Sequence, residues 1–531
     1  MNYNNYEPTC TGTNAGHDSY SIDYDKPNDE CGVFGIYSYA DSSEISVVDC
    51  CYKALYALQH RGQDSCGIVV NDSGVFEYHK ALGLVGDNFK PRTMERLSAA
   101  ASGSGTKIAL AHVRYSPKGQ AIPHNTQPLV ARHIKGPMSI AYNGNLINGA
   151  ELREEYELKG GIYHSTGDTE TIAYAVTEQR LTEPSIEKAL EQAMHKLKGA
   201  YSVVIMSAKK LIAARDPNGF RPLCIGRLPA KSDGTDRDSQ DENRGWVVAS
   251  ESCALNSIGA TFVRDILPGE IVVIGEQEVT SITTHCPNSQ DAQQKRGNLC
   301  VFEYIYVARP DSILEGASVH AARLRAGMFL AQEHPVEADI VVGVPDSGLD
   351  AALGYSRESG IPYGIGFIKN KYIGRTFIQQ TQSDRVSAVK LKLNPLAESV
   401  KGKRVVIVDD SIVRGTTTGI IVELLREAGA SEVHVRISSP PFVHPCYFGT
   451  DIKDRESLIA CRMSLAEVCE WINADSLGYL SLEHVSKLAP EAECGLCDGC
   501  FSGNYPIEVP EALPSDKFDE KIQLNVQLKI D

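Results

Sequence analysis

Short apolar runs separated by polar turns characterise the C-terminal half of the chain. Three of them, at residues 339–344, 404–408 and 432–437, are rich in valine and isoleucine. Runs of this length and composition are typical of strands buried on both faces of a parallel sheet. A helical pattern follows the second run at residues 419–428. We therefore expect a doubly wound α/β domain, a parallel sheet with helices between its strands.

The N-terminal half has shorter strand patterns that partly alternate between apolar and polar positions. Examples lie at residues 32–36, 202–206 and 246–249. A polar stretch at residues 288–297 separates the two halves. The expected organisation is a leader at 1–30, a first domain at 31–275, a linker at 276–298, a second domain at 299–510 and a tail at 511–531.

Composition narrows the class of protein. A chain of 531 residues is long enough for several domains, and a hydrophobic content of 42% supports large cores. The net charge of −16 argues against general binding to nucleic acids or membrane surfaces. No apolar run approaches the roughly 18 residues that a membrane helix needs. The polar leader lacks the features of a secretory signal, so we expect a cytoplasmic protein.

Polar residues after the run at 404–408 suit a sugar phosphate. Asp409 and Asp410 come first, and a turn with Ser411, Arg414, Gly415 and three threonines, Thr416, Thr417 and Thr418, leads into the helical pattern. Backbone N–H groups of such a turn and of a helix N-terminus bind phosphate. Two adjacent carboxylates repel phosphate but suit ribose hydroxyls or Mg²⁺. The segment predicts a ribose 5-phosphate pocket rather than an ordinary strand–loop–helix with exposed acids.

This segment resembles the phosphoribosyl pyrophosphate (PRPP) loop of type I phosphoribosyltransferases. A second apolar run at 341–344 leads into Pro345, Asp346, Ser347 and Gly348. The resemblance implies that this turn contacts the pyrophosphate and its magnesium, with Ser347, Asp409 and Asp410 near the ion. Ligands of open parallel sheets lie beyond the carboxyl ends of the strands, so both turns are expected to face one crevice.

A cysteine directly before the first strand pattern suggests a different chemistry. Cys31 follows a polar leader of thirty residues that ends at Glu30 and in which Asp and Glu outnumber the single Lys26. Removal of that leader as a propeptide would give Cys31 a free α-amine, whose ordinary pKa of roughly 7.7–8.0 suits a base for its own thiol. The alternative is a structural cysteine after a polar tail.

Four further motifs decide between these alternatives. They are Leu58-Gln-His-Arg-Gly-Gln-Asp64, Ala111-His-Val-Arg-Tyr-Ser116, Tyr142-Asn-Gly-Asn-Leu146 and Thr166-Gly-Asp-Thr-Glu170. Together with Cys31 they resemble the glutaminase domain of N-terminal-nucleophile amidotransferases, which implies a four-layer αββα sandwich. The resemblance assigns Arg114 to the carboxylate and Asp168 to the ammonium of glutamine, with Arg61 and Gly62 shaping the pocket. It assigns the oxyanion to the Asn143 side-chain amide and the Gly144 backbone N–H.

A glutaminase joined to a PRPP site resembles the amidophosphoribosyltransferase family from Cys31 to about Pro506. The resemblance implies glutamine hydrolysis at Cys31 and transfer of ammonia to C1 of PRPP, giving 5-phosphoribosylamine, pyrophosphate and glutamate. This is the first committed step of de novo purine biosynthesis. Feedback inhibition by purine nucleotides, a homotetramer and a lid at residues 369–380 are also implied. Departures from the family pattern are Tyr142 in place of a usual His, Gly167, Pro117 and Lys371.

Two other functions fit parts of the sequence. The glutaminase domain also serves other acceptors, as in the glucosamine-phosphate, asparagine and glutamate synthases, but those enzymes lack the segment from Asp409 to Thr418. A non-catalytic PRPP-binding repressor would need a basic DNA-binding module and no nucleophile. The acidic leader and the intact Cys31 argue against it.

The fifteen cysteines include a dense group at Cys494, Cys497 and Cys500. Overlapping C-x-x-C spacings alone are compatible with zinc, a redox pair or an iron–sulfur centre. Similarity to the iron–sulfur subclass of the family, which also carries an acidic propeptide, implies a 4Fe–4S cluster. By that resemblance its ligands are Cys253, Cys446, Cys497 and Cys500, with Cys494 as a spare or an alternative to Cys497.

Overall fold

The computed structural model describes most of the chain between Cys31 and Pro510. The described residues are 31–39, 45–72, 74–102, 107–115, 122–228, 243–276, 278–287, 296–370, 372, 389, 391–450, 452 and 455–510. The expected propeptide, the C-terminal tail, Pro117, Lys371 and most of the expected lid lie outside them.

The first domain contains two antiparallel sheets. The seven-stranded sheet has the order β11 (Thr261–Asp265), β9 (Cys224–Arg227), β10 (Gly245–Ala249), β1 (Gly32–Ser38), β4 (Lys107–Arg114), β2 (Ser65–Asp72) and β3 (Val75–Leu82). The six-stranded sheet has the order β13 (Val279–Ile282), β12 (Ile271–Ile274), β8 (Leu211–Arg215), β7 (Gly199–Ser207), β6 (Gly136–Leu146) and β5 (Leu129–His133).

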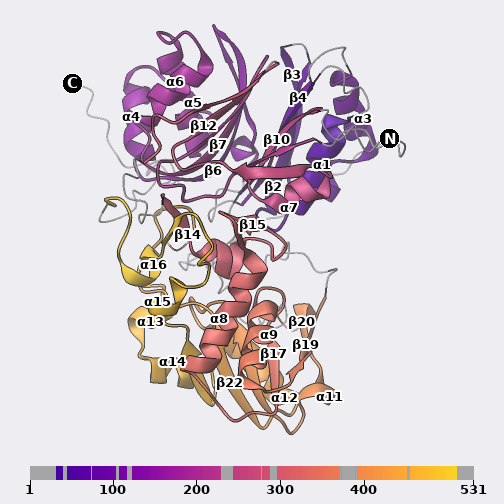
Figure 1. Ribbon diagram of the computed structural model, residues 1–531, viewed down its shortest axis with the longest axis vertical. Coiled ribbons are helices and arrows are strands. Elements are labelled where there is room, and N and C mark those ends of the chain that lie inside the picture. The colour runs from indigo at the N-terminus through magenta and orange to yellow at the C-terminus, as the bar shows by residue number, and fades with distance from the viewer. Residues whose placement is uncertain are drawn as a thin grey trace, which may run out of the picture.

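Helices cover the outer face of each sheet (Figure 1). One group is α1 (Val47–Ala57), α2 (Val85–Asn88), α3 (Pro91–Ala100) and α7 (Ser252–Ser257), and the other is α4 (Gly149–Leu158), α5 (Asp168–Arg180) and α6 (Ile186–Met194). A short 3₁₀ helix, η1 (Pro123–Asn125), precedes β5. Side chains such as Tyr37, Leu110 and Val204 form a core between the sheets. The expected four-layer αββα sandwich is confirmed.

The second domain is built on a five-stranded parallel sheet. Its order is β18 (Tyr363–Gly364), β17 (Ile340–Gly343), β21 (Arg404–Asp409), β22 (Glu432–Ile437) and β23 (Ser476–Tyr479). The three apolar runs correspond to β17, β21 and β22, and the expected parallel sheet is confirmed.

Alternate residues of one strand enter different cores. Val406 packs towards α8 (Val319–Glu333) and α9 (Gly348–Ser359), whereas Val405 and Ile407 pack towards α12 (Thr416–Glu427). Smaller elements complete the domain: α11 (Ala397–Val400), α13 (Ile459–Arg462), α14 (Leu465–Trp471), α15 (Leu482–Val485), α16 (Gly499–Ser502), and the ribbons β15 (Ile313–Leu314) with β16 (Ala317–Ser318) and β19 (Phe367–Lys369) with β20 (Leu393–Pro395). Both faces of the parallel sheet are therefore covered, as the doubly wound fold requires.

The junction between the domains differs from the predicted linker. Strand β13 pairs with β12, so the first domain continues past residue 275 to at least Ile282. On the other side, β14 (Asn298–Cys300) pairs in parallel with β24 (Gly495–Cys497). The C-terminal segment thereby returns to the start of the second domain, a contact that local patterns do not reveal.

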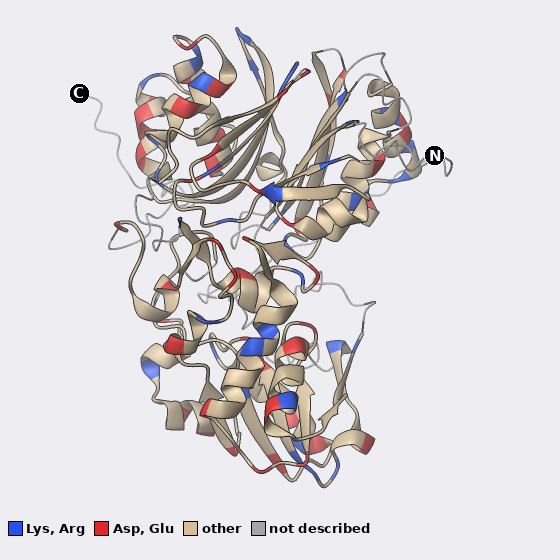
Figure 2. Cartoon of the chain, viewed as in Figure 1, with Lys and Arg blue, Asp and Glu red and all other residues tan. Residues whose placement is uncertain are grey.

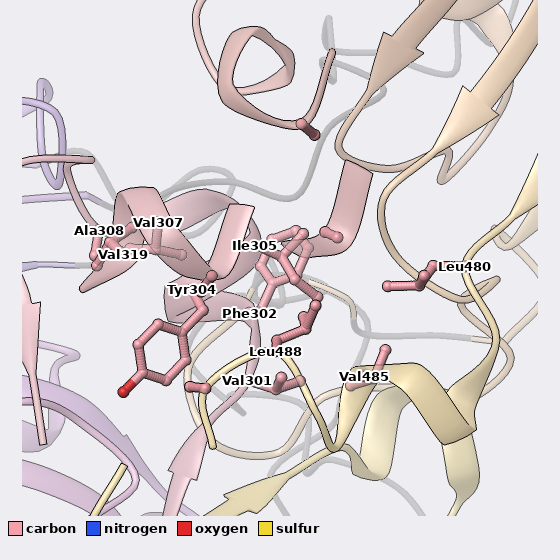
Figure 3. Packing of buried hydrophobic residues seen from close by; sticks show 14 of the residues in the cluster. Val301, Phe302, Tyr304, Ile305, Val307, Ala308, Val319, Leu480, Val485 and Leu488 are labelled. Carbon is pink, nitrogen blue, oxygen red and sulfur yellow. The ribbon is translucent and has the colours of Figure 1, made fainter. Parts of the chain in front are cut away.

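A one-turn π-helix, η3 (Glu303–Val307), follows β14 at this junction. Figure 3 shows Val301, Phe302 and Ile305 in one cluster with Leu480, Val485 and Leu488. Charged residues of both signs are spread over both domains (Figure 2). Among the described residues, no helix combines the length and apolar character that crossing a membrane requires.

Candidate active sites and a cysteine pocket

Cys31 lies directly before β1, next to the end of β4. Its thiol is 3.6 Å from the carbonyl oxygen of Tyr115, a weak hydrogen bond. Burial raises the pKa of the Cys31 thiol, and the Arg114 guanidinium offsets part of that rise. A nucleophile here therefore needs a base to remove its proton.

Arg114 and Asp168 meet in the same place, as the sequence predicts. Arg114 ends β4 and is buried, and its charge interacts with Cys31 and with Asp168. Asp168 begins α5, where its Oδ2 accepts hydrogen bonds from the Leu146 backbone N–H (2.9 Å) and the Tyr142 hydroxyl (3.3 Å). A buried cation and a half-buried anion near one thiol provide the two charges that an amino-acid substrate requires.

Asn143 has an unused hydrogen-bond donor. Its side chain is only 1% exposed, and its Nδ2 has no hydrogen-bond partner among the described residues. Buried donors are nearly always paired, and an orphaned one at a site is a reason to expect a ligand. Asn143 lies in β6, the strand that ends at Leu146 beside Asp168.

Gly144 follows Asn143 and tolerates no side chain. Its φ is +144°, and a Cβ here would lie 2.1 Å from the carbonyl oxygen of Ala200. Only glycine allows β6 to approach β7 so closely while its backbone N–H stays beside the Asn143 amide. The two groups assigned to the oxyanion are consecutive on a rigid strand.

Gly62 also serves close packing. A Cβ at this position would lie 2.5–2.8 Å from the backbone of Arg114. Glycine therefore lets the loop after α1 rest against the end of β4. The role of Gly62 in shaping the glutamine pocket stays a prediction.

Arg61 has partners that the sequence prediction missed. Its fully buried guanidinium forms ion pairs with Glu251 of the first domain and Glu303 of the second. Glu251 also accepts hydrogen bonds from Ser312 Oγ (2.6 Å) and the Arg309 N–H (3.0 Å). The residues after α1 are thus joined to the second domain through buried charges.

Burial alone would raise the pKa of Glu251. His60 and Arg61 beside it instead hold that pKa well below its usual range. Glu251 and Glu303 stand in motifs that match the family, Ala249-Ser-Glu-Ser-Cys253 and Phe302-Glu-Tyr-Ile-Tyr306. Nothing in the local sequence indicates that these glutamates meet at Arg61.

The two predicted PRPP segments meet at the carboxyl ends of β17 and β21. Asp409 and Asp410 are buried, and Asp410 accepts hydrogen bonds from Ser411 Oγ (2.6 Å) and from Ser347 Oγ. Asp346 forms an ion pair with Lys369, the first residue of the expected lid. Both turns therefore face one crevice, as predicted for an open parallel sheet.

Helix α12 begins at Thr416, three residues before the predicted start. Gly415 caps it with a φ of +84°, which favours glycine. Thr416 and Thr417 are partly exposed, whereas Thr418 is buried. The first N–H groups of α12 are thus close to Arg414 in the predicted phosphate turn.

Four cysteines line one apolar pocket, and one of them differs from the prediction. The lining residues are Phe220, Cys300, Phe302, Phe442, Cys446, Phe448, Thr450, Cys497, Cys500 and Tyr505. Cys300 pairs in register with Cys497 across β14 and β24. Burial raises the pKa of Cys300 and of Cys497 to about 12, so both are neutral thiols unless a metal displaces the proton.

Cys253 does not belong to this pocket, so its expected role as a ligand is wrong. It is the second residue of α7 and packs with α1 in the first domain, with its sulfur 3.8 Å from the Ala57 carbonyl oxygen. Cys494 lies elsewhere too, beside Arg215 and Glu315. The Ser-Glu-Ser motif before Cys253 resembles the family pattern, but the fold brings Cys300 to the pocket instead.

Comparisons with known proteins cover both domains. The glutamine amidotransferase domain family matches residues 112–233, and the phosphoribosyl transferase domain family matches residues 317–438. The amidophosphoribosyltransferase of Methanocaldococcus jannaschii is 45% identical over 90% of this chain and 98% of its own length. That of Bacillus subtilis is 42% identical over 91% of this chain and 95% of its own length.

A solved structure extends this similarity to three dimensions. Glutamine PRPP amidotransferase from B. subtilis, complexed with ADP and GMP, superposes with a TM-score of 0.78 at 41% identity. The superposition covers 91% of this chain and 99% of the B. subtilis chain. The similarity thus includes both domains and their order along the chain.

Proposed function

This chain belongs to the amidophosphoribosyltransferase family, and we infer from that membership how its two sites share one reaction. It is a glutamine-dependent enzyme of purine biosynthesis. It converts glutamine and PRPP into 5-phosphoribosylamine, glutamate and pyrophosphate. One observation carries the assignment of the two sites. Cys31 lies in the first domain and the paired acids Asp409 and Asp410 lie in the second, and the buried ion pairs of Arg61 join the two domains.

Glutamine hydrolysis takes place at Cys31. Arg114 binds the substrate carboxylate and Asp168 binds its ammonium, which brings the side-chain amide to the thiol. The thiolate attacks the amide carbon, and the unpartnered Asn143 Nδ2 and the Gly144 N–H stabilise the oxyanion. Ammonia leaves, and water then hydrolyses the thioester to glutamate.

Removal of residues 1–30 as a propeptide supplies the base. The new α-amine of Cys31 takes the thiol proton, which burial otherwise holds in place. Cleavage at Glu30–Cys31 thus activates the glutaminase.

Transfer to PRPP takes place at the carboxyl ends of β17 and β21. Asp409 and Asp410 hold the ribose hydroxyls and favour positive charge on the sugar as pyrophosphate leaves. The residues from Arg414 to Thr418 and the N-terminus of α12 hold the 5-phosphate.

Ser347, Asp409 and Asp410 fit a magnesium ion. A hydroxyl and two carboxylates are oxygen ligands of the kind that Mg²⁺ prefers, and the contact between Ser347 and Asp410 gathers them at one edge of the sheet. These residues would hold a magnesium ion whose positive charge would offset that of the departing pyrophosphate.

Cys300, Cys446, Cys497 and Cys500 fit an iron–sulfur cluster. Four thiols around an apolar, aromatic pocket are the donor set of a 4Fe–4S cluster. The cluster would tie β24 and α16 to β14 and has a structural role. These thiols and the cluster fit a reducing, cytoplasmic setting.

Purine nucleotides are proposed as feedback inhibitors. The B. subtilis relative was solved with ADP and GMP. The 5-phosphate pocket at Arg414–Thr418 suits the phosphate of such nucleotides. We also propose a homotetramer, by similarity alone.

The test of this function is the stoichiometry of the reaction. Anaerobically purified protein with Cys31 at its N-terminus is incubated with glutamine, PRPP and Mg²⁺. We expect one glutamate and one pyrophosphate per turnover. Glutamate release without PRPP consumption in the complete mixture would contradict the proposal.

The cluster is tested separately by iron content. Cys300→Ser should lower bound iron from four per chain to a small residue, whereas Cys253→Ser should leave it unchanged. The reverse result would restore the ligand set inferred from sequence.

A further inference from the structure

Tyr142 stands between the two halves of the glutamine site. It precedes Asn143 on β6, and its ring is 5% exposed. Its hydroxyl lies 3.3 Å from Asp168 Oδ2 and 3.4 Å from the Ala200 carbonyl oxygen. A hydroxyl has one proton, and the charged acceptor, which is also the nearer, gives the stronger hydrogen bond. Tyr142 therefore donates to Asp168.

The backbone of Tyr142 is held from both sides. Its N–H donates to Gln127 Oε1 (2.8 Å), and its carbonyl accepts from His112 Nε2 (3.0 Å). Burial lowers the pKa of His112 to about 3, so the imidazole is neutral, and its contact with a carbonyl places the proton on Nε2. These contacts fix where the tyrosine hydroxyl points.

Both hydrogen bonds that Asp168 accepts reach the same carboxylate oxygen. The Leu146 N–H (2.9 Å) and the Tyr142 hydroxyl both reach Oδ2, and no described residue donates a hydrogen bond to Oδ1. This arrangement fixes the plane of the carboxylate and keeps the acceptor capacity of Oδ1 for a ligand. The ammonium of an amino acid is such a ligand.

We propose that Tyr142 is a positioning residue that sets the preference of the glutaminase site for an amide substrate carrying an α-ammonium group. It acts through Asp168, so the inference rests on the proposed role of Asp168. The sequence marks this position as a departure from the family pattern, which usually has His here.

The electrostatics of Asp168 agree with a hydrogen bond from Tyr142. Burial raises the pKa of Asp168, and the hydrogen bonds from Leu146 and Tyr142 oppose that rise. Loss of the tyrosine hydroxyl therefore raises the pKa further. Because only the carboxylate attracts ammonium, activity should then decline at a higher pH on the acid side.

The experiment compares two amides in the wild type and Tyr142→Phe. Glutamine carries the α-ammonium, and glutaramate has the same amide and carboxylate without it. For Tyr142→Phe we expect kcat/KM for glutamine to fall about tenfold, mainly through KM, as loss of one hydrogen bond to a charged group predicts. Hydrolysis of glutaramate should be unchanged, and the acid limb for glutamine should move to higher pH.

Two further variants control for packing. Tyr156→Phe removes another buried hydroxyl on α4, one with no hydrogen-bond partner in the part of the chain that the structure describes, and should leave hydrolysis of both amides unaffected. Tyr142→His restores an N–H donor and should recover part of the lost kcat/KM. Thermal unfolding of each variant checks that it is folded.

The outcomes separate the inference from the proposed function. An unchanged kcat/KM for glutamine in Tyr142→Phe, or an equal loss for both amides, overturns the role of Tyr142 alone. If the wild type itself does not prefer glutamine to glutaramate, Asp168 is not the ammonium site. That result overturns both the inference and the assignment on which it rests.

Discussion

The glutamine site and the PRPP site place their functional groups on different parts of the fold. In the first domain, Arg114 and Asn143 lie on strands of two facing sheets and are almost fully buried. In the second, Ser347, Asp410 and Arg414 lie on turns beyond strand ends, and Thr416 and Thr417 are partly exposed. One site is set within the sandwich, and the other lies at the edge of a sheet.

This difference follows from where charge arises in each reaction. Glutamine hydrolysis creates negative charge on an oxygen that was neutral, so fixed donors in a water-poor site stabilise it most. PRPP already carries its charges and must enter from water. Backbone N–H groups at a helix N-terminus and a closing segment suit that task. The paired acids are the exception, since they are buried at the edge of an otherwise open site.

Asp410→Asn should have the largest effect. It tests whether the buried charge of the paired acids matters for the reaction at the PRPP site. The amide keeps the shape, and its oxygen can accept a hydrogen bond from one of the two serines, Ser347 or Ser411, while its NH2 group donates to the other; the change removes a negative charge from a buried position. We expect pyrophosphate release with either nitrogen donor to fall by about 10³-fold, while glutamine hydrolysis continues.

The matched control is Glu337→Gln, which removes an exposed acid on the same domain. It should leave pyrophosphate release unchanged. Equal losses in both variants would mean that the effect comes from overall charge and not from the site.

Asn143→Ala should have the next largest effect and tests the buried site. Loss of one oxyanion donor typically lowers turnover by about 10²-fold, so kcat for glutamine hydrolysis should fall by that factor with little change in KM. Rapid mixing with glutamine alone gives both constants. A change confined to KM would show that Asn143 binds the ground state and does not stabilise the oxyanion.

Glu303→Gln should have the smallest effect on catalysis and tests what joins the two sites. It leaves Arg61 with one carboxylate in a fully buried place, and removing one partner of such a pair costs about 3–5 kcal/mol. We expect a clear decrease in the unfolding temperature in calorimetry at a fixed scan rate. Glu483→Gln, which breaks an exposed pair with Lys487, should not change it.

The second domain could be predicted in more detail than the first. Its strands are short apolar runs, and Asp409 to Thr418 form one continuous segment, so local chemistry is sufficient. The start of α12 was placed too late because three threonines are weak helix formers, and the cap at Gly415 was not anticipated. The lid lies outside the described residues and stays a prediction.

Contacts between distant residues could not be predicted in this way. Arg61 contacts Glu303, which is 242 positions away in the sequence. Cys300 lies beside Cys497 because β14 pairs with β24, and no local sequence pattern predicts that pairing. The motif before Cys253 resembles that of a family and predicts it as a ligand, but a motif does not state which strand faces the pocket. The predicted domain boundary at residue 275 differs from the structure for a similar reason. Strand β13 belongs to the first domain because it pairs with β12, and local sequence does not reveal that pairing.

The central claim is that the two sites divide one reaction, and crossed variants test it most directly. Pyrophosphate release from PRPP is measured with glutamine and with ammonia for the wild type, Cys31→Ala and Asp410→Asn, together with glutamate release. We predict that Cys31→Ala loses activity with glutamine and keeps it with ammonia, whereas Asp410→Asn loses pyrophosphate release with both and still forms glutamate. Loss of ammonia-dependent activity in a folded Cys31→Ala protein would contradict the account.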